Sequence, residues 1–127
     1  MKPEEKARII IDRMLNDAGW EVVDRNHYSP EVSAIAVEEG LLKGNREADY
    51  LLFLNGKAVG VLEAKKESVS ISSEIVADQA EKYTRGVPHW CQAWMNPLPL
   101  VYLSNGRELL FRDTREVDSE YISSVSY

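Results

Sequence analysis

The chain has 127 residues, a formal net charge of −6 and 44% hydrophobic residues, which together indicate one compact globular domain. Its single cysteine, Cys91, excludes an internal disulfide and favours a reducing, cytoplasmic location. No apolar stretch approaches the roughly 20 residues of a membrane span, so we expect no membrane partner. The acidic charge argues against tight, autonomous DNA binding, because phosphate contacts need lysine and arginine.

The first predicted element is a helix from Pro3 to Ala18. Pro3 suits a first helical turn, and acidic residues follow it at the positive end of the helix dipole. Apolar residues then recur at helical spacing up to Gly19, a common helix stop. They are Ala7, Ile10, Ile11, Met14, Leu15 and Ala18. The segment WEVVDRN predicts a first strand, whereas residues 27–45 mix strand and turn signals.

The segment EADYLLFLNGKAVGVLEAKK predicts a β-hairpin, because Asn55-Gly56 separates two apolar runs. The sequence allows two loops. With a two-residue loop, Asp49 lies on the wrong face of the hairpin for Glu63. With a three-residue loop, or with a bulge elsewhere, the two carboxylates share one face, where Lys65 joins them.

The second half of the chain predicts a helix and a second hairpin. A loop leads into a capped helix from about Ser73 to Arg85. The segment LPLVYLSNGRELLFRD predicts two strands around Asn105-Gly106. From Thr114 to Tyr127 there is no clear periodicity, so we expect a loose tail. The predicted order is a helix, three strands, a helix and two strands, which is an α/β fold.

Three charged residues stand where a buried hairpin would carry apolar ones, namely Asp49, Glu63 and Lys65. Burying two carboxylates together is unfavourable unless a cation compensates their charge. Mg²⁺ does so, since it binds one or two carboxylates and keeps waters for a substrate phosphate. The lysine can then orient the attacking water or stabilise charge on the phosphate. The plain alternative is a set of solvated charges near strand ends.

A glutamine and a tyrosine on the second predicted helix lie one turn apart, so both can reach one place. In order and spacing, the chain resembles the PD-(D/E)xK nuclease core with its accessory Q-x-x-x-Y motif, through Asp49, Glu63-Ala64-Lys65 and Gln79-x-x-x-Tyr83. More specifically, it resembles the N-terminal nuclease domain of the R (restriction) subunit of type I restriction enzymes, over most of the chain. The shared segments are AGW, EADYLLFLNGKAVGVLEAKK, DQAEKY and WCQAWMNPLPLVYLSNGRELLF.

The resemblance implies a restriction-endonuclease-like mixed β-sheet flanked by helices, and a metal-dependent cut in double-stranded DNA. Asp49, Glu63 and the Ala64 carbonyl would bind Mg²⁺, with Mn²⁺ as a substitute. An acid on the first helix, Glu4 or Glu5, would complete the metal site.

The resemblance also assigns roles in catalysis and DNA contact. Lys65 would serve the attacking water. Gln79 and Tyr83 would lie beside the site and position the scissile DNA backbone, with Lys66 and Arg46 as further backbone contacts.

The partners implied are a helicase-type motor region of the same subunit and the methylation and specificity subunits of a restriction complex. No P-loop motif occurs, so ATP would act only through a motor region outside these 127 residues. Cleavage should be non-specific in itself, because no basic recognition helix is evident. We expect residues 1–127 to form a single nuclease domain of a longer chain. The alternatives are a stand-alone DNA repair or recombination nuclease of the same fold, and a non-catalytic docking module.

Overall fold

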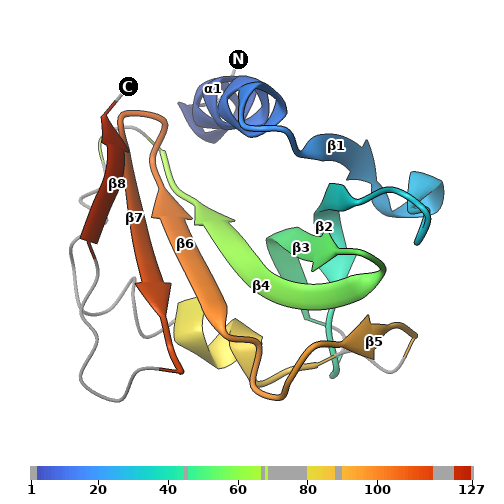
Figure 1. Cartoon of the computed structure of the whole chain (residues 1–127). Coiled ribbons are helices and arrows are strands. Elements are labelled where there is room, and N and C mark those ends of the chain that lie inside the picture. Colours follow the sequence, from blue (N-terminus) through green and yellow to red (C-terminus); the bar gives the residue numbers. More distant parts are fainter. Residues whose placement is uncertain are drawn as a thin grey trace.

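In the computed structural model (Figure 1), the part of the chain that the structure describes contains the helix α1, a short 3-10 helix, eight strands and a helical segment at residues 80–84. The structure describes residues 3–44, 46–66, 68, 80–87, 90–115 and 122–126, with only the backbone given for 3, 4 and 122–126. Within that part of the chain, no helix is long and apolar enough to cross a membrane. The elements are α1 (Pro3–Asp17), β1 (Glu21–Asp24), η1 (Arg25–His27), β2 (Ala34–Leu41), β3 (Glu47–Leu54), β4 (Lys57–Ala64), β5 (Gln92–Ala93), β6 (Leu100–Ser104), β7 (Glu108–Asp113) and β8 (Ile122–Ser126).

The strands form one mixed sheet in the order β1-β2-β3-β4-β6-β7-β8, with β5 paired to β4. β1 runs parallel to β2, and β4 runs parallel to both β5 and β6, whereas the other neighbours are antiparallel. Residues 80–84 are helical and lie in the connection from β4 to β6. The predicted α/β fold with a mixed sheet is thereby confirmed.

The C-terminal segment differs from the expected loose tail, because residues Ile122–Ser126 pair with β7 as the edge strand β8. Serines fill three of its five positions. Apolar alternation is therefore too weak to mark it as a strand, and pairing with the edge of β7 forms it instead. β5 was not predicted either, since a strand of two residues leaves no periodic pattern.

Apolar side chains cover both faces of the sheet. On one face, α1 packs Ala7, Ile11 and Leu15 against residues of β2, β3 and β4. On the other face, the helical segment 80–84 contributes Ala80 and Tyr83 to a second buried cluster. The sheet is thus flanked by helical residues on each side, as the resemblance implied.

The β3–β4 hairpin combines a two-residue turn with a bulge. Asn55 and Gly56 both have positive φ, 50° and 80°, as the type I′ turn of a two-residue hairpin requires. Between Leu52 and Phe53 the register shifts by one residue, and Val59 is the extra residue on β4. Of the two loops that the sequence allows, the shorter one forms, and a bulge further along corrects the pairing.

The bulge decides which side chains meet at the open end of the hairpin. Beyond it, Tyr50 pairs with Leu62, and the same register sets Asp49 opposite Glu63. Without the bulge, a two-residue turn would set Asp49 opposite Leu62 and turn the carboxylates to opposite faces. The predicted bulge elsewhere in the hairpin is therefore what brings the two acids together.

Candidate active site

Two carboxylates lie side by side where β3 begins and β4 ends. Glu63 is only 5% exposed, and the backbone N–H of Asp49 donates to its Oε1 at 3.3 Å. The backbone N–H of Ala64 in turn donates to Oδ2 of Asp49 at 2.8 Å. Each strand therefore orients the carboxylate of the other, so the pair is built into the hairpin.

The electrostatics of this pair are unfavourable without a cation. Burial, and then the negative charge of Asp49, raise the pKa of Glu63 to about 9, while the Lys65 ammonium acts in the opposite direction. Two carboxyl groups so close together cannot both ionise easily. Among the described residues, no group of three or more His, Cys, Asp and Glu side chains can hold a metal ion. Asp49 and Glu63 could nevertheless hold one whose other ligands are backbone oxygens and water.

Lys65 follows the pair at the end of β4. Its backbone N–H donates to the Ser104 carbonyl at 2.8 Å, which continues the pairing of β4 with β6. Its side chain is half-buried, and its charge lowers the pKa of Glu63. The structure therefore brings together the three charged residues that the hairpin sequence singled out.

Tyr83 lies within electrostatic range of both carboxylates. Burial raises the pKa of Tyr83, the charges of Glu63 and Asp49 raise it further, and Arg46 lowers it. The Lys43 N–H donates to the Gly86 carbonyl at 3.0 Å, which joins the loop before β3 to the residues just after the helical segment 80–84. The helical segment thus places a hydroxyl within the field of both carboxylates, and the loop places the Arg46 guanidinium within the field of that hydroxyl.

The remaining predicted site residues are Gln79, Glu4, Glu5 and Lys66. Gln79 lies outside the described residues, as do the predicted helix start at Ser73 and the side chain of Glu4. Glu5 and Lys66 are exposed. Their roles stay predictions.

The first helix contributes an arginine to this region instead. Arg8 Nη2 lies 2.6 Å from Asp49 Oδ1, and Arg8 Nη1 lies 3.8 Å from Glu39 Oε1. The guanidinium also lies 5.7 Å from the ring centroid of Tyr50. Sequence reasoning missed Arg8 and Glu39. The available signal was a charged residue directly after Ala7, on a helix whose apolar stripe must face the sheet.

A second polar cluster continues from Arg8 along α1. The Tyr50 hydroxyl donates to Oδ1 of Asp12. Burial, followed by the charge of Asp12, raises the pKa of Glu38 to about 7, and Arg8 lowers it. Polar contacts as well as the apolar stripe therefore hold α1 against β2 and β3 near the carboxylate pair.

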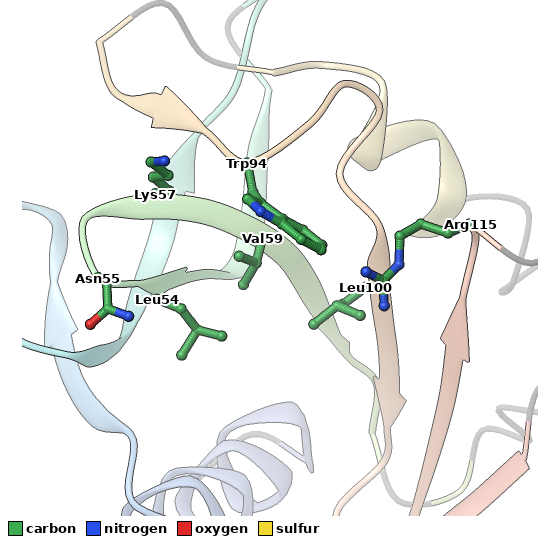
Figure 2. Close-up of a pocket in the computed structure, with 7 residues that line it drawn as sticks. All are labelled: Leu54, Asn55, Lys57, Val59, Trp94, Leu100 and Arg115. Atoms are coloured by element: carbon green, nitrogen blue, oxygen red, sulfur yellow. The ribbon is translucent and has the colours of Figure 1, made fainter.

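A cavity of about 520 Å³ lies at the opposite, turn end of the hairpin (Figure 2). It is lined by Leu54, Asn55, Lys57, Val59, Trp94, Leu100 and Arg115. The Arg115 guanidinium carbon lies 4.8 Å from the Trp94 ring centroid. Among the residues that the structure describes, no predicted site residue lines this cavity, so it is separate from the carboxylate pair.

Comparison with known families identifies the family of the chain. The family described as type I restriction enzyme EcoKI endonuclease subunit second domain matches residues 25–118, more than half of the chain. The matched span includes Asp49, Glu63, Lys65 and Tyr83, but not α1. Comparisons with curated proteins and with solved structures give no match. The resemblance to a type I restriction subunit is confirmed, and the chain belongs to the family of the type I restriction enzyme EcoKI endonuclease subunit second domain.

Proposed function

We propose that this chain is a metal-dependent endonuclease domain that hydrolyses phosphodiester bonds of double-stranded DNA, as part of a type I restriction R subunit. The observation that carries the proposal is the pairing of Asp49 with Glu63 across β3 and β4. Two carboxylates that lie side by side and are largely buried destabilise the folded state, because the charged form of each disfavours the charged form of the other. In a site for a hard cation, both carboxylates serve as ligands.

The donor set supports Mg²⁺ as the ion, with Mn²⁺ as its substitute. Both carboxylates offer hard oxygen ligands, and Glu63 is nearly buried, so a cation would replace the proton that the raised pKa of Glu63 keeps on this carboxyl. The Ala64 carbonyl is the further ligand that we propose, with water in the remaining positions. Such an ion supplies polarisation of a phosphoryl oxygen and a more acidic bound water.

The remaining residues act on the substrate and the water. Lys65 orients the attacking water and stabilises negative charge that grows on the phosphate. The Tyr83 hydroxyl holds an oxygen of the scissile backbone, and Gln79, four residues earlier in the sequence, is the further residue that we propose for this role. Arg46 and Lys66 contact the flanking phosphates.

In this proposal, other parts of the restriction complex bring the DNA to the nuclease domain. The net charge of −6 supports weak and strongly salt-dependent DNA binding by the isolated chain, because few cations face the phosphates. Cleavage by this domain is therefore non-specific in our proposal. A helicase-type motor region of the same subunit uses ATP to bring DNA to it, and the methylation and specificity subunits determine which DNA is treated.

Plasmid cleavage by the complete restriction enzyme tests the proposal. Glu63→Gln should abolish cleavage while ATP hydrolysis continues, because only the metal site is changed. Glu47→Gln is the matched control, since Glu47 is a carboxylate on β3 that is 43% exposed and paired with Arg25. Normal cleavage by the Glu63→Gln enzyme would contradict a nuclease role for this site and favour a docking module.

A further inference from the structure

Arg8 lies between carboxylates of two neighbouring strands. Its Nη2 is 2.6 Å from Oδ1 of Asp49 on β3, whereas its Nη1 is 3.8 Å from Oε1 of Glu39 on β2. The first contact is a short, charge-assisted hydrogen bond, and the second leaves room for a closer approach. The guanidinium therefore binds one acid closely and has a second within reach.

The two oxygens of Asp49 are held by different kinds of group. Oδ2 accepts the backbone N–H of Ala64 at 2.8 Å, a contact that the strand fixes. Oδ1 accepts the Arg8 guanidinium, which ends a long side chain that is 22% exposed. A divalent ion between Asp49 and Glu63 would face that guanidinium at close range, and a site as buried as Glu63 screens such repulsion weakly.

Glu39 is placed to receive the displaced guanidinium. The register sets it opposite Asp49, because its two neighbours on β2 pair with Tyr50 and Ala48. Its φ is 52°, a left-handed conformation that non-glycine residues seldom adopt and that persists mainly at functional sites. Its side chain is 58% exposed, so forming an ion pair there removes little water.

We propose that Arg8 is a positioning residue that controls access of the cation to Asp49. In the metal-free chain, the guanidinium holds Asp49 in place of a cation. When Asp49 and Glu63 bind a divalent ion, the guanidinium moves to Glu39. The inference rests on the proposed function and adds to it that Arg8 regulates cation binding at the metal site. Because Arg8 lies outside the family match at residues 25–118, α1 adds this control to the matched sheet.

Titration of Mn²⁺ into the 127-residue chain, followed by calorimetry without DNA, tests the role of Arg8. Arg8→Gln removes the competing charge, so the dissociation constant for Mn²⁺ should fall by at least about fivefold, within the usual range of coupling between two sites. Arg8→Lys keeps the charge and should stay closer to the wild-type value. Far-ultraviolet circular dichroism confirms that each variant is folded.

Glu39→Gln gives a second test at an exposed position, where folding is not at risk. Removing the receiving carboxylate should keep the guanidinium on Asp49 and weaken Mn²⁺ binding. In the Arg8→Gln background, the same change should have a clearly smaller effect, because no guanidinium remains to be received. Equal effects of Glu39→Gln in both backgrounds would show that Glu39 acts without Arg8 and would overturn the transfer.

The outcomes separate this inference from the proposed function. Mn²⁺ binding by the wild type with unchanged or weaker binding by Arg8→Gln would overturn the control by Arg8 and leave the metal site standing. Mn²⁺ binding by Arg8→Gln but not by the wild type would support both. If neither chain binds Mn²⁺, the metal site is absent and the inference is overturned with it. Asp49→Asn is the control for specific binding, and it should lose Mn²⁺ in either background.

Discussion

The two ends of the β3–β4 hairpin differ in chemistry and in what determines them. The turn end is set locally by Asn55-Gly56, whose positive φ values suit a two-residue turn, and it borders an apolar cavity with Trp94. The open end holds Asp49 and Glu63, which meet only because of a bulge between the two ends. Local sequence therefore fixes the turn, whereas the site depends on a one-residue shift in pairing that the turn does not determine.

Alanine variants at the two ends of the hairpin should differ most strongly in their effect on DNA cleavage. Asp49→Ala, Glu63→Ala and Lys65→Ala should each lower cleavage by the complete enzyme at least about 10³-fold, the equivalent of ~4 kcal/mol of activation free energy. Lys57→Ala, at the turn end, should leave cleavage unchanged. Double variants at the open end should lose little more than single ones, because the residues act as one unit. Retained cleavage in any open-end variant would remove that residue from the site.

Gly60→Ala should disturb the strand that joins the two ends. A Cβ at Gly60 would lie 2.4 Å from the Leu100 carbonyl oxygen, so β4 and β6 would have to move apart. The free energy of unfolding in urea should fall by about 1–3 kcal/mol. Gly86→Ala is the control, because its added Cβ would meet nothing nearer than 3.5 Å. Equal stability of the two variants would contradict the close approach of β4 and β6.

The metal-free open end should also make stability depend on pH. The pKa of Glu63 is raised from 4.5 to about 9, so the folded chain keeps a proton that the unfolded chain has already lost. Its contribution to stability is complete below about pH 4.5 and is lost as the pH rises towards about 9. Glu38, with a pKa raised to about 7, adds a similar loss at lower pH.

The variant Glu63→Gln isolates the part of the pH-dependent stability that is due to the open end of the hairpin. Between about pH 5 and 9, in EDTA, the wild type should lose at least ~1.4 kcal/mol more unfolding free energy than the variant, the value of one pKa unit. Urea denaturation at several pH values measures this difference. Parallel pH profiles for the two proteins would contradict the buried carboxylate pair.

The smallest expected effect concerns the helical segment beside the open end. Tyr83→Phe keeps the ring and removes the hydroxyl, and Gln79→Ala removes its proposed assistant. Each should slow single-turnover cleavage at least about tenfold, or ~1.4 kcal/mol, with ATP-driven translocation unaffected. Tyr28→Phe is the matched control, because Tyr28 stacks on Phe53 and lines a cavity with turn residues. Wild-type rates in both site variants would leave the pair with a packing role alone.

The sequence predicted most of the regular structure and the identity of the paired acids. The helix α1 and both hairpins follow from apolar periodicity and turn residues, which act over short distances, whereas the mixed sheet was implied by the resemblance to the nuclease family. The sequence allowed a bulge as one of its alternatives but did not place it at Val59, because regular and shifted pairings present similar apolar patterns to the core. Arg8 and Glu39 were missed because their meeting depends on how α1 docks and on a strained residue within β2, neither of which leaves a periodic signal.

Anomalous scattering from a crystal of the 127-residue chain soaked in Mn²⁺ shows whether a divalent ion binds between Asp49 and Glu63. We expect one peak within about 2.0–2.6 Å of a carboxylate oxygen of Asp49 and of Glu63, the range of oxygen ligands around such hard divalent ions. We also expect the Arg8 guanidinium then to lie beside Glu39. Carboxylates without a peak, and Arg8 still on Asp49 at saturating Mn²⁺, would contradict these expectations.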